Sequence, residues 1–138
     1  MDWTDQQLDY SAIHFGSGIR LLESRLFLRV SGEDRITFMH GMCTADVKSL
    51  LPGELTRALF LTEHAHVIAD CFIYALQEPA IWLEVEQASW ITIREHLERF
   101  LVADDVEFDE LKTLTALQIE GPSSNDVISE AFGEEARD

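Results

Sequence analysis

The sequence predicts an α+β fold in which a few helices pack on a mostly antiparallel sheet. Short apolar or alternating runs, which are typical of strands, outnumber the stretches with helical periodicity. Most of these runs also follow one another without a helix between them. The expected order is βαβββαββα, and this order has too few helices for a sheet built from parallel strands with helical crossovers.

Length and charge limit the classes of protein that the chain can represent. Its 138 residues suffice for one domain with a hydrophobic core and no staples. We divide it into a polar lead-in over residues 1–25 and a domain over residues 26–138, which we expect to be the first part of a longer protein. A formal net charge of −16 argues against nucleic-acid and anionic-membrane partners. No stretch has the length and apolarity of a membrane span.

The first elements of the predicted domain are a strand and two short helices. Residues 26–30 are apolar on both faces, which indicates a strand inside a sheet. Ser31 is placed to cap the helix that follows, and Asp34 is placed to complete a capping box. We expect Gly41 to end this helix and Thr44 to begin a second, short helical turn.

The rest of the domain alternates between strands and helices, separated by turns at Pro52-Gly53 and Pro79. Predicted strands cover residues 55–62, 66–76, 81–86, 106–108 and 115–119, and predicted helices cover 88–102 and 126–132. In the longer helix, Glu95 and Arg99 stand in the favourable order for an ion pair. The joint periodicity predicts a core made of Ile36, Met39, Leu59, Ile73, Leu83, Trp90, Ile93 and Leu97.

Histidine and cysteine residues do not form a convincing metal site. The candidates are His40, Cys43, His64, His66 and Cys71. His64 and His66 would share a strand face, but no further ligand follows at a matching spacing, so we expect the purified chain to hold no zinc. The two cysteines are expected to be reduced thiols in a cytoplasmic protein, because the N-terminus has no apolar signal sequence.

Asp70 is the residue most indicative of function. In a strand, residues 68, 70, 72 and 74 point the same way, so this carboxylate shares a face with Ile68, Phe72 and Tyr74. A buried carboxylate without a partner is costly, so Asp70 should be paired, exposed or in contact with a hydrogen-bond donor. The residues alone leave open whether it lies at a sheet edge or in a pocket. Aromatic neighbours and one acceptor would suit a flat, nitrogen-rich heterocycle.

Several segments together resemble a known family. VSGEDRITFM (30–39), DVKSLLPG (46–53), LFLTE (59–63) and VIAD (67–70) are similar, in order and spacing, to the N-terminal folate-binding domain of the glycine-cleavage T-protein family. The likeness is greatest to its YgfZ-type branch and covers about residues 19–122. It implies an α+β domain that holds tetrahydrofolate. It also implies that Asp70 faces this cofactor, that Phe72 and Tyr74 line its pocket, and that Met39 contacts it.

The resemblance also implies a function and its alternatives. A YgfZ-type chain would be an accessory protein linked to iron–sulfur cluster maintenance and tRNA modification, with a reduced folate and an iron–sulfur client protein as partners. The first alternative is an aminomethyltransferase that transfers a one-carbon unit, and the second is an interaction domain that binds no folate. Ala65 and His66 replace the glycines of many relatives. The family's second half, with its cysteine motif and further folate residues, is absent, so we expect weak or no binding and no activity from this chain alone.

Overall fold

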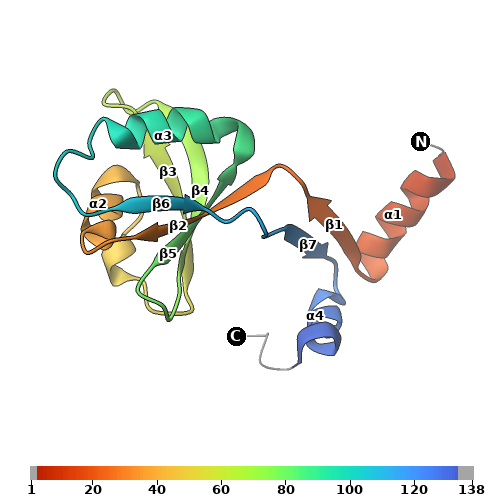
Figure 1. The fold of residues 1–138 in the computed structure, drawn as a ribbon. Coiled ribbons are helices and arrows are strands. Elements are labelled where there is room, and N and C mark those ends of the chain that lie inside the picture. Colours follow the sequence, from red (N-terminus) through yellow and green to blue (C-terminus); the bar gives the residue numbers. More distant parts are fainter. Residues whose placement is uncertain (1–2, 134–138) are drawn as a thin grey trace. The chain divides into compact units, whose positions relative to one another are not determined.

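The chain forms two compact units in a computed structural model, which describes residues 3–133 and their side chains from residue 9 onward (Figure 1). The larger unit comprises residues 24–114, and the smaller one combines residues 1–23 with residues 115–138.

The larger unit is built on a five-stranded sheet in which every pair of neighbouring strands is antiparallel. The order across the sheet is β3-β4-β5-β2-β6. The strands are β2 (Arg25–Ser31), β3 (Leu55–Leu61), β4 (Val67–Ala75), β5 (Ile81–Glu86) and β6 (Glu107–Glu110). This arrangement confirms the predicted α+β class, and it places β4 inside the sheet.

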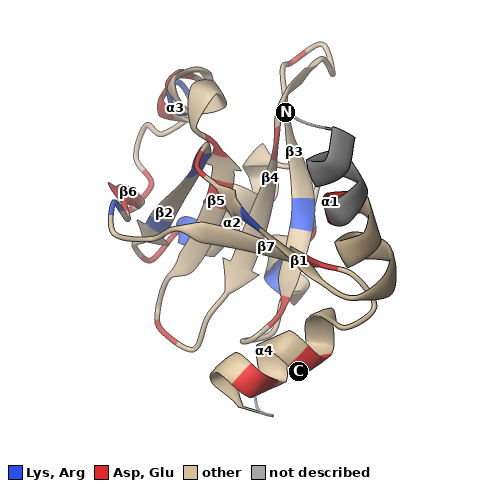
Figure 2. Ribbon diagram, turned by 90° about the vertical axis from the view of Figure 1, so that its right-hand side faces the viewer, with Lys and Arg blue, Asp and Glu red and all other residues tan. Residues whose placement is uncertain are grey.

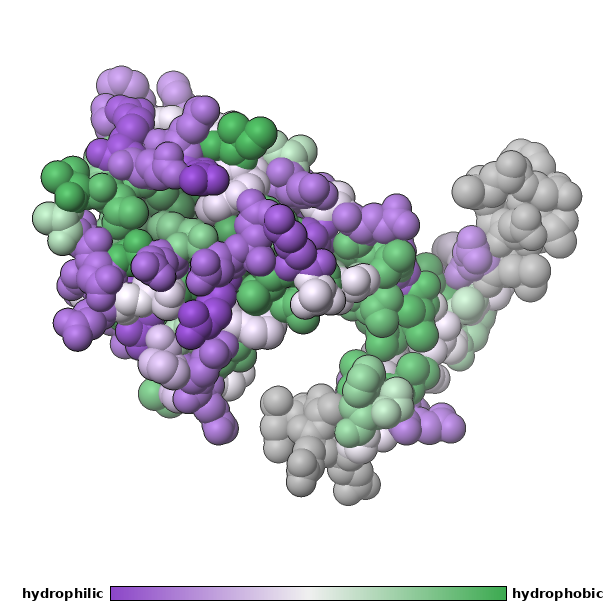
Figure 3. Space-filling model, viewed as in Figure 1, coloured by the Kyte–Doolittle hydropathy of each residue, from purple (hydrophilic) through white to green (hydrophobic). Residues whose placement is uncertain are grey.

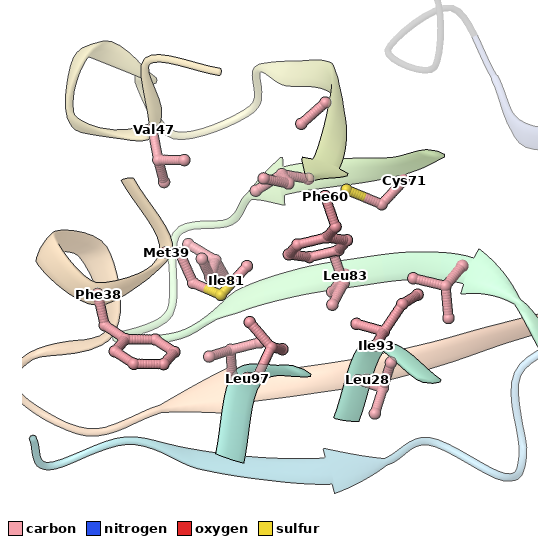
Figure 4. Close-up of a cluster of buried hydrophobic side chains, with 14 of the residues drawn as sticks. Leu28, Phe38, Met39, Val47, Phe60, Cys71, Ile81, Leu83, Ile93 and Leu97 are labelled. Atoms are coloured by element: carbon pink, nitrogen blue, oxygen red, sulfur yellow. The ribbon is translucent and has the colours of Figure 1, made fainter. Parts of the chain in front are cut away.

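Two α-helices cover one face of this sheet. They are α2 (Arg35–Met42) and α3 (Trp90–Glu98), and two short 3-10 helices, η1 (Val47–Ser49) and η2 (Gln87–Ser89), lie between strands and helices. Met39 from α2 and Ile93 and Leu97 from α3 join strand residues such as Leu83 in a fully buried cluster (Figure 4). The hydrophobic effect that stabilises the unit therefore acts on this side of the sheet.

Six of the eight predicted core residues are buried: Met39, Ile73, Leu83, Trp90, Ile93 and Leu97. Ile36 is half-buried and packs against the same cluster. The prediction for Leu59 is wrong, because this residue stands opposite Asp70 in the β3–β4 pair. Ala58 and Phe60 point into the core in its place, as the two-residue period of a strand requires.

The start of α2 differs from the predicted capping box. The helix begins at Arg35 rather than after Ser31, because Gly32 adopts a φ of +101° and turns the chain first. Asp34 does not cap the helix with its side chain; its carboxylate accepts a hydrogen bond from the backbone N–H of Asp105, at 2.9 Å. The helix also continues past Gly41 to Met42, so the predicted stop at the glycine is wrong.

The second helix is shorter than predicted. Residues 87–89 form η2, and α3 itself ends at Glu98. The expected pair of Glu95 with Arg99 is not formed. Arg94 bonds Glu98 at 2.7 Å within the helix, while Arg99 reaches the β3–β4 turn and bonds Glu63 at 3.2 Å.

The smaller unit joins the two ends of the chain. It consists of α1 (Trp3–Phe15), β1 (Gly18–Leu22), β7 (Ala116–Glu120) and α4 (Ser124–Phe132), and β1 pairs antiparallel with β7. The sequence predicted β7 and α4 but neither α1 nor β1, which fall in the expected lead-in. The domain boundary at residue 26 stays a prediction.

The surface mixes apolar and acidic regions. Apolar residues gather over β1 and β7 in Figure 3, where Ile19, Leu21 and Leu117 are exposed. Acidic residues mark β6, α3 and α4 in Figure 2. Among residues 3–133, no helix is both long enough and apolar enough to cross a membrane.

Candidate functional site

The face of the large sheet that α2 and α3 leave uncovered carries charged and aromatic side chains, and we call it the polar face. In an antiparallel sheet, residues directly opposite one another share a face. One such row runs from Arg57 through Phe72 and Glu84 to Phe27. The polar face comprises Arg25, Phe27, Arg29, Arg57, Leu59, Asp70, Phe72, Tyr74, Trp82, Glu84 and Glu86.

Asp70 is paired and half-buried on this face. One of its carboxylate oxygens, Oδ2, accepts a hydrogen bond from Nη2 of Arg57 at 2.9 Å. The exposed fractions of the two side chains are 39% for Asp70 and 67% for Arg57. Asp70 lies on an inner strand of the sheet, opposite Leu59 of β3, while the pairing of β4 with β5 begins one residue later, at Cys71. An ion pair so exposed to water contributes little to stability, so Arg57 can leave Asp70 at low cost.

Glu84 is the most buried charge on the polar face and connects two other side chains. Its residue is only 7% exposed. Oε1 accepts a hydrogen bond from Nε of Arg25 at 2.6 Å, and Oε2 accepts one from the hydroxyl of Tyr74. Burial raises the pKa of Tyr74, and the hydrogen bond and charge of Glu84 raise it further. Tyr74 is therefore a neutral donor to Glu84 at physiological pH.

Arg25 is held on three sides. Besides Glu84, it faces Glu86 at 3.4 Å, and its guanidinium lies 5.8 Å from the centre of the Phe72 ring. Burial alone lowers the pKa of Arg25, but the hydrogen bonds and charges of Glu84 and Glu86 outweigh this effect and the pKa is raised. The Arg25 guanidinium thus lies over the ring of Phe72, which follows Asp70 on the same face of β4.

A second polar group lies beside this network. Glu78, from the turn before β5, accepts a hydrogen bond from the Trp82 indole at 2.8 Å and faces Nε of Arg29 at 3.6 Å. Each of the three arginines on the polar face thus has a carboxylate partner. The face offers aromatic surface and acceptor oxygens, and its positive charge is already neutralised.

The structure brings three of the four predicted site residues together and separates the fourth. Asp70, Phe72 and Tyr74 alternate along β4 on the polar face. Met39 belongs to α2 and is fully buried in the core on the other side of the sheet. Its predicted contact with a cofactor therefore has no support in the geometry of the larger unit and stays a prediction.

Sequence reasoning missed Glu84 and Arg25 as part of the site. The alternation in residues 81–86 does indicate that Glu84 points away from the core, together with Trp82. The alternation does not show which residue pairs with Glu84, because its partner Arg25 comes from a strand some sixty residues earlier in the chain. Only the register of β2 against β5 joins them.

Ala65, in the β3–β4 turn, has a left-handed backbone conformation. Its φ is +60°, in the region that glycine adopts without strain. A glycine at this position would therefore avoid the strain that the β-carbon of Ala65 introduces. Neighbouring His64 and His66 belong to no metal cluster, since the described residues contain no group of three or more candidate ligands.

Both cysteines are free thiols and lie near the core. Burial raises the pKa of Cys71 to about 12, with smaller contributions from Cys43 and Asp70. Burial also raises the pKa of Cys43. Neither sulfur is a ready nucleophile, because the thiolate is the reactive form.

Each unit also has a hollow on its surface. One, of about 220 Å³, lies between α3 and β6 and is lined by residues that include Trp90, Leu101 and Phe108. The other, of about 480 Å³, belongs to the smaller unit, where Ile13 and Ile19 line it. Neither hollow collects the acceptor and aromatic groups that make the polar face a candidate binding surface.

The larger unit is an antiparallel α+β domain whose sheet has one face covered by helices and one polar face. Residues 11–138 match the family model described as the GCVT N-terminal domain, and the chain belongs to this family. A chloroplastic "putative transferase" of Arabidopsis thaliana is 32% identical over 93% of this chain and 29% of its own length. An uncharacterized protein of Aquifex aeolicus is 28% identical over all of this chain and 89% of its own length.

Among solved structures, the glycine cleavage system aminomethyltransferase T of Bartonella henselae has the same fold. The TM-score is 0.81 over 90% of this chain, at 18% sequence identity. This chain spans 34% of that protein and 29% of the Arabidopsis relative. The predicted membership of the T-protein family is confirmed.

Proposed function

We propose that this chain is a tetrahydrofolate-binding domain of a YgfZ-like accessory protein, linked to iron–sulfur cluster maintenance and tRNA modification. The observation that carries the proposal is the position of Asp70, half-buried inside the sheet between an aromatic ring and an exposed arginine. A reduced folate and an iron–sulfur client protein would be its partners. The cytoplasm is the proposed compartment, because free thiols such as Cys43 and Cys71 are typical of reducing conditions.

The chemistry of the polar face fits a reduced folate. Its fused ring carries amino and ring N–H donors, and Asp70 and Tyr74 offer oxygens that can accept from them. The ring of Phe72, with Arg25 above it, offers a flat surface for an aromatic group. Folate would supply the one-carbon chemistry, while the residues named here would bind and orient it.

Two alternatives have specific support. Similarity to an aminomethyltransferase in fold favours a one-carbon transferase, which would need residues beyond the third of that protein that this chain spans. The carboxylate partners of Arg25, Arg29 and Arg57 favour an interaction domain instead. The glutamate tail of folate is anionic, and these arginines are already neutralised.

The test is titration with folinic acid, a stable reduced folate, of the wild-type chain and the Asp70→Asn variant. We expect millimolar or weaker binding by wild type, so NMR detection is required. Replacing the charged acceptor should weaken binding by about 1.5–3 kcal/mol, or roughly 10- to 100-fold.

Asp104→Asn is the matched control, because Asp104 is an exposed acid in the loop after α3. It removes the same charge from the chain without touching the polar face. Equal affinities for wild type and Asp70→Asn would remove Asp70 from the site. Absence of binding by all three proteins would favour the interaction domain.

A further inference from the structure

Glu84 has a property that no role assigned above requires: both of its oxygens are used, and by donors of different kinds. Oε1 accepts from the Arg25 guanidinium and Oε2 accepts from the Tyr74 hydroxyl. A guanidinium can only donate, whereas a phenol can donate or accept. Arg25 therefore holds Oε1 of Glu84 in place. The bond at Oε2 then determines whether the Tyr74 hydroxyl can donate a hydrogen bond to a ligand or only accept one.

The hydrogen of the Tyr74 hydroxyl is committed to Glu84. A phenol oxygen has a single hydrogen, so a ligand that meets Tyr74 finds only its lone pairs. Glu84 is buried and is itself held by Arg25, and the raised pKa of Tyr74 keeps this hydrogen on the phenol. On the ligand side, Tyr74 is consequently an acceptor.

We infer that Glu84 sets the hydrogen-bond polarity of Tyr74, so that the polar face selects a ring edge bearing N–H donors and rejects one bearing a carbonyl oxygen. This inference rests on the proposed function, because it takes the fused ring of a folate as the group that meets Tyr74. Glu84 is a positioning residue here, since it acts through Tyr74 and Arg25. Asp70, four residues before Tyr74 on the same strand face, is a further acceptor on the polar face.

The substitution Glu84→Gln replaces the carboxylate with an amide that can be oriented in only one way. The carbonyl oxygen of the amide must accept from Arg25, because the guanidinium has no acceptor to offer the amide NH₂ group. The NH₂ group then faces the Tyr74 oxygen and donates to it. The Tyr74 hydrogen is released toward the ligand, so the variant converts Tyr74 from an acceptor into a donor without changing the shape of the site.

Two small heterocycles distinguish these states. Pterin carries an amino group at the position where lumazine carries an oxo group, and lumazine bears a hydrogen on the neighbouring ring nitrogen, where pterin has a lone pair. The two molecules therefore present opposite hydrogen-bond patterns at this edge of an otherwise identical fused ring. Both fluoresce, so binding to the chain can be followed directly. The measurement is the ratio of the lumazine and pterin dissociation constants, which we call the donor preference, for wild type, Glu84→Gln and Tyr74→Phe.

For wild type, we expect a donor preference of at least about tenfold, the effect of one mismatched hydrogen bond. Glu84→Gln should reduce this ratio at least about fivefold or reverse it, and Tyr74→Phe should also reduce it. If Glu84 had only a structural role, Glu84→Gln would weaken the binding of both ligands by the same factor and leave the donor preference unchanged. Asp104→Asn should match wild type in both constants.

An unchanged donor preference in Glu84→Gln or in Tyr74→Phe would overturn the inference. Tyr74→Phe removes only a hydroxyl, so it decides the question even if Glu84→Gln does not fold. Binding of folinic acid with no donor preference in wild type would overturn the inference and leave the proposed function standing. Absence of binding by folinic acid, pterin and lumazine would overturn both.

Discussion

The contacts of Glu84 should also be measurable as stability, and the size of the effect can be worked out from the structure. Glu84→Gln keeps the shape of the side chain but removes its charge. The hydrogen bond from Arg25 loses the charge of its acceptor, and the charge-assisted bond from Tyr74 is replaced by a neutral one of opposite direction; each such change costs roughly 1 kcal/mol. The Arg25 side chain is 15% exposed, so it also loses the partner that offset its burial. We expect the free energy of unfolding to fall by about 2–4 kcal/mol in total. Breaking a buried pair completely costs roughly 3–5 kcal/mol, but here Glu86 still faces Arg25.

A double-mutant cycle measures how much stronger the bond between Glu84 and Tyr74 is than the neutral bond that replaces it in Glu84→Gln. Tyr74→Phe should cost about 1.5–3 kcal/mol by itself, the usual value of a hydrogen bond to a charged group. The double variant should lose less than the sum of the single losses, by at least about 1 kcal/mol, because the two residues are in direct contact. Urea unfolding followed by tryptophan fluorescence gives each free energy of unfolding.

The matched control in this experiment is Asp70→Asn, which removes the exposed partner of Arg57. Its loss should stay below about 1 kcal/mol, as for other surface ion pairs. If Glu84→Gln proves as mild as Asp70→Asn, or if the coupling with Tyr74 is under about 0.5 kcal/mol, the network described for the polar face is not formed in solution.

Three further predictions concern the core and the loops. Leu97→Ala should cost about 2–5 kcal/mol because the side chain is fully buried, and a loss under about 0.5 kcal/mol in urea unfolding would contradict its place in the core. Gly32→Ala should cost more than about 3 kcal/mol, because the added β-carbon would lie 2.0 Å from the backbone oxygen of Asp105 and because Gly32 has a φ of +101°. A melting temperature equal to that of wild type would refute this. The Cys71 thiol should contribute a loss of about 1 kcal/mol between pH 9 and 10, because it keeps its proton to about pH 12 when folded but releases it near 9.0 when unfolded. The raised pKa values of Cys43 and Tyr74 add to the loss of wild type, so Cys71→Ala should reduce the loss by about 1 kcal/mol, and an unchanged pH dependence would contradict the burial of the thiol.

The elements of the larger unit could be predicted because their signals are local. Alternation in residues 81–86 correctly places Leu83 in the core and Glu84 opposite it. The same rule failed at Leu59, because a strand with leucine and phenylalanine on neighbouring positions does not show from sequence which face is buried. The adjacent Phe60 occupies the core, and Leu59 lies beside Asp70.

The first 25 residues show the limit of such signals. Helix α1 has no strong apolar stripe, and β1 forms its sheet with β7, about a hundred residues further along the chain. A strand whose only sheet neighbour is so distant cannot be recognised from local periodicity. The same holds for the site: Asp70, Phe72 and Tyr74 were found because they alternate in one strand, whereas Arg25 needed the register of another.

The central claim is that the polar face binds a reduced folate, and mapping of amide chemical shifts during titration with folinic acid tests it most directly. We expect the backbone amides of Asp70, Phe72 and Tyr74 in β4, and of Glu84 in β5, to shift together with one dissociation constant. Amides of α3 and β6, which line a hollow of this unit, should stay unchanged. Shifts confined to α3 and β6, or no shifts at folinic acid concentrations well above millimolar, would contradict this claim.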